Sequence, residues 1–176
     1  MKIIYFGDIV GRAGRVAVLN ALDEIRARFA PDVMIANGEN AAHGFGITEK
    51  ICNEFFEAGI DVIVTGNHAW DQREIVGFID REPRLLRPNN YPKLTPGSGS
   101  VIAQTRSSKR VLVIQVMGRL FMEPLDDPFD EREDCDGRLS RRPCVHGRGI
   151  AFAYPDRRRA HIAGRYGLSD GCRHVR

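Results

Sequence analysis

The sequence predicts an α/β fold built around a parallel β-sheet. Three short apolar runs occur at similar intervals along the chain, and segments with a helical apolar period separate them. Strands and helices that alternate in this way form right-handed βαβ units. The predicted strands are residues 2–6, 32–36 and 61–65.

Each predicted strand is apolar along nearly its whole length, which is typical of strands buried on both faces. Each also ends at a glycine-containing polar segment, where the chain can turn sharply. We therefore expect these three strands to lie in the centre of the fold, with their carboxyl ends at one edge of the sheet.

Helices are predicted over residues 14–29, from Thr48 to about residue 58, and after Asp71. Thr48 and Asp71 are suitable N-caps. The apolar positions of these three segments recur every three or four residues, as on one face of a helix. The inward faces are Val18, Leu22, Ile25 and Phe29 in the first helix, Ile51 and Phe55 in the second, and Ile75 and Ile79 in the third.

Residues 83–129 have a different pattern. Residues 83–100 are rich in Pro, Gly, Ser and Asn and are predicted to be a loop. Residues 101–104 and 111–116 are predicted strands, and residues 117–129 an ordered loop. We expect one domain over residues 1–129.

Residues 130–176 differ in composition from the rest of the chain. Of the 26 basic residues of the chain, 15 lie in residues 1–129 and 11 in this tail, where all 11 are Arg. Of the 23 acidic residues, 16 lie in residues 1–129 and 7 in the tail. Apart from the run at residues 150–154, the tail has no sustained period, and we expect it to be irregular and poorly ordered. An arm for nucleic acid is an alternative that we do not favour.

The composition, with 43% hydrophobic and 28% charged residues, is that of a globular protein. No apolar run approaches the roughly 20 residues that span a bilayer. The N-terminus lacks the pattern of a signal peptide, so we expect a cytoplasmic protein without membrane contact. The four cysteines form no C-x-x-C pair and are expected to be reduced thiols.

Polar side chains follow each of the three predicted strands. The candidates are Asp8 after the first strand, Glu39 and Asn40 after the second, and Asn67 and His68 after the third. Ligands bind in the crevice at the carboxyl ends of parallel strands. These five residues are therefore expected to converge, although they are far apart in the sequence.

This set of side chains is typical of a metal centre. Two carboxylates, two amides and an imidazole form a mixed oxygen and nitrogen shell that suits Mn, Fe, Zn or Mg. Two cations about 3.5–4 Å apart can clamp both oxygens of an in-line phosphoryl displacement. His68 is then a candidate general acid for the leaving group.

Each residue taken alone has another interpretation. Asp8 could cap a helix, and His68 could be a structural histidine. The segments Asn37-Gly38 and Gly66-Asn67 could be plain turns. His43 and Trp70 are equally compatible with the wall of a site and with packing. The spacing of Gly7, Gly11 and Gly14 does not fit the dinucleotide fingerprint.

At these motifs the sequence resembles the calcineurin-like metallophosphoesterases, and within them the bacterial YmdB-type phosphodiesterases. The resemblance rests on GDIVGRAGR (7–15), NGENAAHGFGIT (37–48), TGNHAWD (65–71), RPNNYP (87–92) and MGRLFMEPLDDPF (117–129). It implies a four-layer α/β/β/α sandwich, incomplete in this chain. It also implies hydrolysis of phosphodiesters, including cyclic nucleotides such as 2′,3′-cAMP.

The resemblance further implies site roles. Asp8, Glu39, Asn40 and Asn67 would bind two metal ions, with Glu39 bridging them, and His68 would be the proton donor. Iron is the expected metal, with Mn, Zn or Mg as alternatives.

The chain departs from this family after Phe129. The family's second half supplies histidine ligands in D-F-H-A-E-like and G-T-H-T-H-like segments, and neither is present here. Codons can be chosen for the tail so that the next reading frame encodes a sequence resembling the family's second half, with a G-S-H-S-H segment. We therefore hypothesise a deletion and a frameshift just after Phe129. The alternative to an active enzyme is therefore a truncated, impaired metal-binding fragment, whose exposed sheet surface would favour a homo-oligomer.

Overall fold

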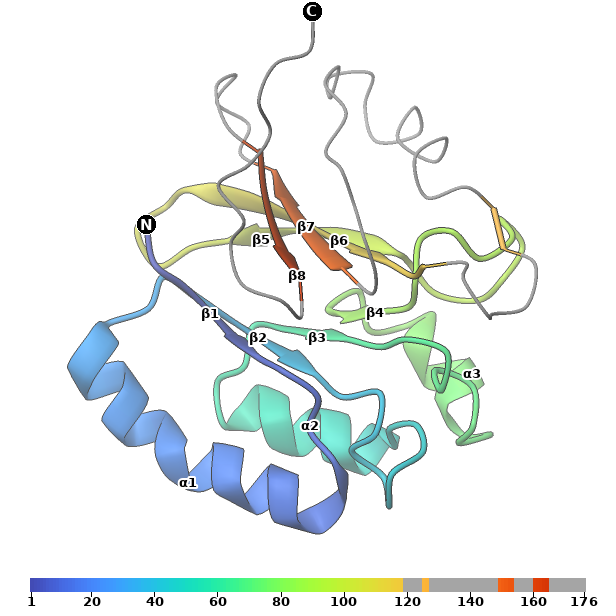
Figure 1. Cartoon of the computed structure of the whole chain (residues 1–176), viewed down its shortest axis with the longest axis horizontal. Helices are drawn as coiled ribbons and strands as arrows, with labels where there is room; N and C mark the ends of the chain where they lie inside the picture. The colour runs from blue at the N-terminus through green and yellow to red at the C-terminus, as the bar shows by residue number, and fades with distance from the viewer. Residues whose placement is uncertain (119–124, 127–148, 154–159, 165–176) are drawn as a thin grey trace, which may run out of the picture.

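The computed structural model of the chain describes residues 1–118, 125–126, 149–153 and 160–164. Two stacked β-sheets and a layer of helices make up this part of the chain (Figure 1). The helices cover one face of a parallel sheet, and an antiparallel sheet covers its other face. The described residues thus form three layers.

The parallel sheet contains the three predicted strands and a short fourth one. Its order is β1-β2-β3-β4, from β1 (Ile3–Phe6), β2 (Val33–Asn37), β3 (Val62–Val64) and β4 (Leu85–Leu86). The predicted strands are confirmed to within one residue at each end. The prediction of a loop over residues 83–100 is wrong at β4, which pairs with β3 through Ile63 opposite Leu85. A strand of two residues is too short to produce a recognisable period.

The three predicted helices are α1 (Gly11–Phe29), α2 (Glu49–Glu57) and α3 (Ile75–Ile79). Thr48 caps α2 as predicted, because its Oγ1 accepts a hydrogen bond from the Ile51 N–H. Asp71 does not cap α3, whose N-cap is Glu74. Asp8 does not cap α1 either, because this helix begins after Val10 and has no side-chain cap.

The hydrophobic core has two parts, one on each face of the parallel sheet. Alternate residues of β2 point to opposite faces. Met34 packs with the helices, whereas Val33 and Ile35 pack against the second sheet. This two-sided burial explains the continuous apolar runs of β2 and β3. The expectation that the first strand is also buried is wrong, because β1 is at the edge of the sheet and its Tyr5 is 37% exposed.

The second sheet has the order β5-β6-β7-β8, with every neighbouring pair antiparallel. Its strands are β5 (Ser100–Gln104), β6 (Arg110–Val116), β7 (Gly149–Ala153) and β8 (Ala160–Gly164). The first two were predicted, and β7 coincides with the apolar run at residues 150–154. β8 was not predicted. The remainder of the tail, like most of the loop predicted over residues 117–129, lies outside the described residues.

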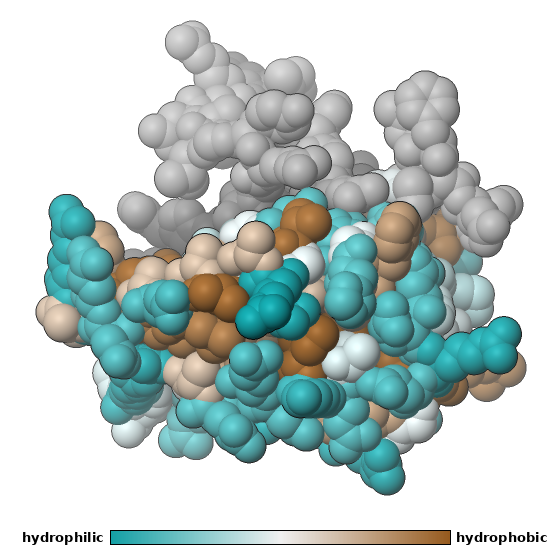
Figure 2. Space-filling view, turned by 90° about the horizontal axis from the view of Figure 1, so that it is seen from below, coloured by the Kyte–Doolittle hydropathy of each residue, from teal (hydrophilic) through white to brown (hydrophobic). Residues whose placement is uncertain are grey.

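The predicted α/β class with a parallel sheet is confirmed. A fourth layer remains a proposal drawn from the resemblance. Hydrophilic side chains predominate in the view from the helix side, with hydrophobic ones visible among them (Figure 2). Val16 and Phe29 of α1 are exposed, so the prediction that Phe29 faces inward is wrong. No helix in the described part of the chain has the length and hydrophobicity to cross a membrane.

Cys52 provides a test of the core beneath α2. It is a free thiol with 0% exposure, and burial raises its pKa far above the ordinary value. Because the reactive form is the thiolate, we expect iodoacetamide to leave Cys52 unmodified in the folded protein and to alkylate it in guanidinium chloride. Peptide mapping by mass spectrometry distinguishes Cys52 from the other cysteines. Rapid native labelling of Cys52 would contradict this packing of α2.

Candidate metal centre

The loops that follow β1, β2 and β3 meet at one edge of the parallel sheet. Main-chain hydrogen bonds join them, from Ile9 N–H to the Asn37 carbonyl at 3.2 Å and from Gly38 N–H to the Val64 carbonyl at 2.9 Å. Gly11 N–H also donates to the Asn40 carbonyl, at 2.9 Å. The convergence expected from the sequence is therefore present in the backbone.

Asp8 and Asn40 are in direct contact across the first two loops. The Asn40 Nδ2 donates a hydrogen bond to Oδ1 of Asp8 at 2.7 Å. Because an amide directs its oxygen away from its nitrogen, Oδ1 of Asn40 is not used in this bond. The pair therefore combines a carboxylate with an amide oxygen at the exposed rim of the site.

Glu39 lies deeper, with an exposed fraction of 1%. Its carboxylate packs directly against Gly66 of the third loop, and a Cβ at position 66 would overlap with Oε2 of Glu39. Only glycine leaves room for this carboxylate. A cation beside Glu39 would offset part of the free-energy cost of burying its charge.

Asn67 carries a buried oxygen that has no hydrogen-bond partner among the described residues. This atom is Oδ1, in the same loop as Gly66. Most buried side-chain polar atoms in proteins are hydrogen-bonded, so an orphaned amide oxygen calls for an explanation. Coordination of a metal ion by Oδ1 provides one, because hard cations take side-chain amide oxygens as ligands.

His68 is oriented by a carboxylate. Its Nδ1 lies 2.6 Å from Oδ2 of Asp71, and both side chains are partly exposed. With Nδ1 held by Asp71, Nε2 is the ring nitrogen left for another partner. This arrangement makes Asp71 an orienting partner of His68, a role that sequence reasoning missed because helix capping was the simpler interpretation of its position.

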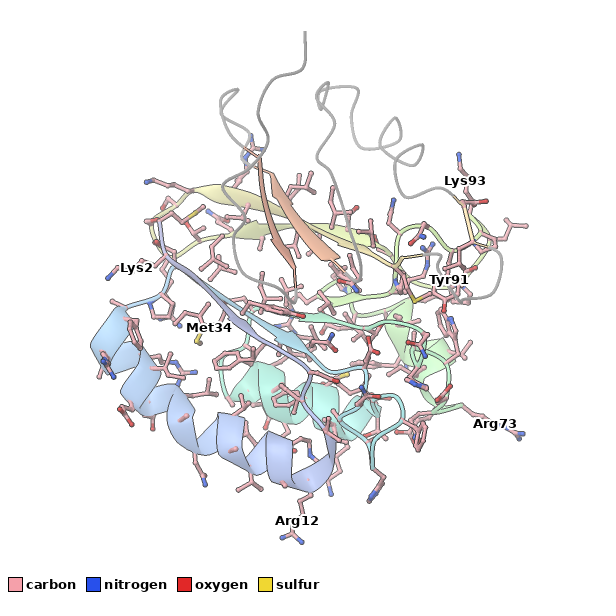
Figure 3. All side chains as sticks on the ribbon, in the orientation of Figure 1. Lys2, Arg12, Met34, Arg73, Tyr91 and Lys93 are labelled. Carbon is pink, nitrogen blue, oxygen red and sulfur yellow. The ribbon has the colours of Figure 1, made fainter. Side chains whose placement is uncertain are left out.

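Trp70 takes part in the packing of the core. It packs against the core on the helix side of the sheet, and its ring meets that of Tyr91 edge to face at 6.2 Å. His43 is exposed on the second loop, with a positive φ of 55°. Arg12 and Arg73 extend outwards into solvent and do not point at one another (Figure 3).

Gln115 of β6 was not identified from the sequence. It is 4% exposed, and its Nε2 donates to the backbone carbonyl of Thr65 at 2.7 Å, just before the third loop. Its Oε1 is a second buried oxygen without a hydrogen-bond partner in the described part of the chain. Gln115 continues the row of buried positions that Val111 and Val113 occupy on β6. The core between the two sheets is apolar at these two valines and becomes polar at Gln115.

Replacing Gln115 by leucine should destabilise the protein by about 1–3 kcal/mol, because it leaves the buried Thr65 carbonyl without its donor. Urea unfolding measures the loss. Gln104→Leu is the matched control, since the same change falls on an exposed position of β5 and is expected to shift the free energy of unfolding by less than about 0.5 kcal/mol. Equal effects of the two changes would show that the bond to Thr65 contributes nothing.

The donors fit a metal site, but only in part. They are two carboxylates and two amides, a set of oxygen ligands suited to hard or borderline cations. Across the described residues no group of three or more His, Cys, Asp and Glu side chains is close enough to hold a metal ion. Two observations support metal binding: the Asn67 oxygen without a hydrogen-bond partner, and the space that Gly66 leaves for the Glu39 carboxylate.

Comparisons with known proteins place the chain in a family. The family model described as YmdB-like protein matches residues 4–144. A 2′,3′-cyclic-nucleotide 2′-phosphodiesterase of Bacillus subtilis is 42% identical over 142 residues, which are 81% of this chain and 53% of that protein. A putative phosphatase/phosphodiesterase of Mycoplasma pneumoniae is 29% identical over 148 residues, which cover 77% of this chain and 52% of that protein.

Two solved structures resemble the fold. A hypothetical protein from Thermus thermophilus has a TM-score of 0.70 at 41% identity, covering 77% of this chain and 52% of that one. A phosphatase from Mycoplasma pneumoniae has a TM-score of 0.70 at 28% identity and similar coverage, 77% and 50%. The chain spans about half the length of the curated relatives it matches.

Proposed function

Because the chain belongs to the YmdB-like family, we propose that it is a metal-dependent phosphodiesterase. The observation that carries the proposal is the position of the buried Glu39 carboxylate, the orphaned Asn67 oxygen and the oriented His68 on neighbouring loops that main-chain hydrogen bonds join. Acidic and amide oxygens beside an oriented imidazole are the groups that phosphodiester hydrolysis needs.

In this proposal Asp8, Glu39, Asn40 and Asn67 would hold two metal ions, with Glu39 as a ligand to both. Iron is the preferred metal, with Mn, Zn and Mg as alternatives. Bound ions of this kind acidify a water molecule and neutralise charge on the phosphate. The deep position of Glu39 supports its role as the shared ligand, and the Asp8–Asn40 contact supports a common outer position for these two residues.

His68 supplies the proton for the leaving group. Asp71 holds Nδ1 of the ring, so Nε2 is the nitrogen from which a proton would pass to the departing oxygen. Asp71 acts through His68 and is therefore a positioning residue.

The proposed substrates are phosphodiesters, and cyclic nucleotides such as 2′,3′-cAMP within that class. The name of the Bacillus subtilis relative supports the narrower choice. A cytoplasmic location and a homo-oligomer remain predictions, and nucleic acid is not an expected partner.

A second candidate function is metal binding with impaired hydrolysis. The partial donor set favours it, because the described residues hold no cluster of three or more His, Cys, Asp and Glu side chains. Missing ligands lower metal affinity steeply. On this ground slow turnover is expected of the chain as it stands.

The purified chain, loaded with Fe²⁺ or Mn²⁺, separates the two candidates. Metal analysis and hydrolysis of bis(p-nitrophenyl) phosphate are measured together, with EDTA-treated protein and Asp8→Ala as controls. The proposal predicts bound metal and turnover that both controls abolish. Bound metal without turnover supports the second candidate, and neither metal nor turnover refutes both.

A further inference from the structure

Phe45 presents an exposed aromatic ring beside the proton donor. Its side chain is 58% exposed, although it is large and apolar. The centroid of its ring lies 5.3 Å from that of His68, and the two rings are nearly perpendicular, at 82°. A single exposed apolar residue is ordinary on a protein surface. Phe45 differs in its position beside His68 and in the hydrogen bonds that fix its backbone.

The second and third loops together fix the position of Phe45. Its carbonyl accepts a hydrogen bond from Nε2 of Gln72 at 2.7 Å, and its N–H donates to the Ala42 carbonyl at 3.0 Å. The glycines on either side have positive φ values, 94° at Gly44 and 73° at Gly46. The ring is therefore held outside the core by a turn that glycine makes feasible.

The same turn connects Phe45 to the candidate ligands. Gly46 N–H donates to the Glu39 carbonyl at 2.7 Å, and a Cβ on Gly46 would come within 3.0 Å of the His68 carbonyl. The backbone around Phe45 is thus in contact with both Glu39 and His68. A leaving group that takes its proton from His68 would lie within reach of the Phe45 ring, because the two rings are in edge-to-face contact.

We propose that Phe45 is a stacking platform that selects phosphodiesters whose leaving group carries a nucleobase or another flat aromatic group. This inference rests on the proposed function of the site. More than half of the ring is open to solvent, so its surface can take a second ring by offset stacking. Stacking of a base on an aromatic side chain tolerates every base, because each has a π-face.

A purely orienting role for Phe45 makes a different prediction. Asp71 already holds the imidazole through Nδ1, and a ring that only steadied His68 would affect ligands with and without a base alike. A stacking platform affects only the ligand that has a base. The ratio of two dissociation constants therefore decides between the roles.

The test uses the full chain loaded with Mn²⁺ and two phosphate monoesters. Adenosine 3′-monophosphate carries a base, whereas glycerol 2-phosphate is a phosphate ester of a secondary alcohol without one. Isothermal titration is expected to show tighter binding of the adenosine ester. Phe45→Leu should reduce this preference by about 5- to 100-fold, and Phe45→Trp should retain it. Glycerol 2-phosphate should bind the three proteins alike.

Circular dichroism and the Mn²⁺ content of each variant confirm that the fold and the site persist, since Phe45 contributes little to the core. An unchanged preference in Phe45→Leu, or an equal loss for both esters, overturns the stacking role. Wild-type protein that binds both esters equally also overturns it and leaves the phosphate site intact. Wild-type protein that binds neither ester refutes the proposed function, and this inference with it.

Discussion

Replacing Glu39 by glutamine is expected to weaken metal binding by roughly 100-fold or more. Residues that only orient metal ligands already cost 10- to 100-fold when they are changed, and Glu39 is the buried carboxylate that we propose as a direct ligand. Glutamine has nearly the same shape and can occupy the space beside Gly66. The loss therefore follows from the charge and not from packing.

Thermal unfolding with and without Mn²⁺ separates this effect from a structural one. A ligand that binds only the folded state stabilises it by about 2.7 kcal/mol at a concentration 100 times its dissociation constant. We expect this metal-dependent gain to disappear in Glu39→Gln. The metal-free stability should stay within ~1 kcal/mol of wild type, because an amide is less costly to bury than a charged carboxylate.

Glu24→Gln provides the matched control, since Glu24 is an exposed carboxylate on α1. It should keep the full metal-dependent rise in melting temperature. A fall in metal-free stability of Glu39→Gln, combined with an unchanged response to Mn²⁺, would assign Glu39 to the fold and not to the metal. Isothermal titration with Mn²⁺ gives the affinity independently of unfolding.

The sequence predicted the parallel sheet and the edge at which the site lies. Continuous apolar strands ending in glycine and polar residues define both features, because burial on two faces and a sharp turn leave clear patterns. The contacts of Asp8 with Asn40, and of Glu39 with Gly66, follow from that edge. The pattern of residues was sufficient to bring these loops together.

The sequence could not predict contacts that depend on tertiary structure. Asp71 is an ordinary N-cap by its position, yet its carboxylate turns to His68. Gln115 lies in an apolar strand, and its amide becomes important only because β6 passes over the end of β3. Phe45 is one aromatic residue in a glycine-rich loop, and the fold alone places its ring beside His68. Local periodicity carries no information about such pairings.

Replacing His68 by asparagine should lower kcat by an amount that depends on the leaving group. General acid catalysis contributes about 10²- to 10⁴-fold, and only a leaving group that departs as a basic alkoxide needs the proton. Hydrolysis of 2′,3′-cAMP should therefore lose the full factor. Hydrolysis of bis(p-nitrophenyl) phosphate should fall by less than about tenfold, because p-nitrophenolate leaves without protonation.

Asp71→Asn should give a smaller loss with the same dependence on the leaving group, because it removes the carboxylate that holds Nδ1 and keeps the imidazole itself. Asp23→Asn is the matched control, since it makes the same change at a fully exposed carboxylate of α1. Equal losses for both substrates in His68→Asn would contradict proton donation and point to binding of the phosphate or the metal. Unchanged Mn²⁺ affinity in both variants, measured by titration, would then exclude the metal and leave phosphate binding as the role of His68.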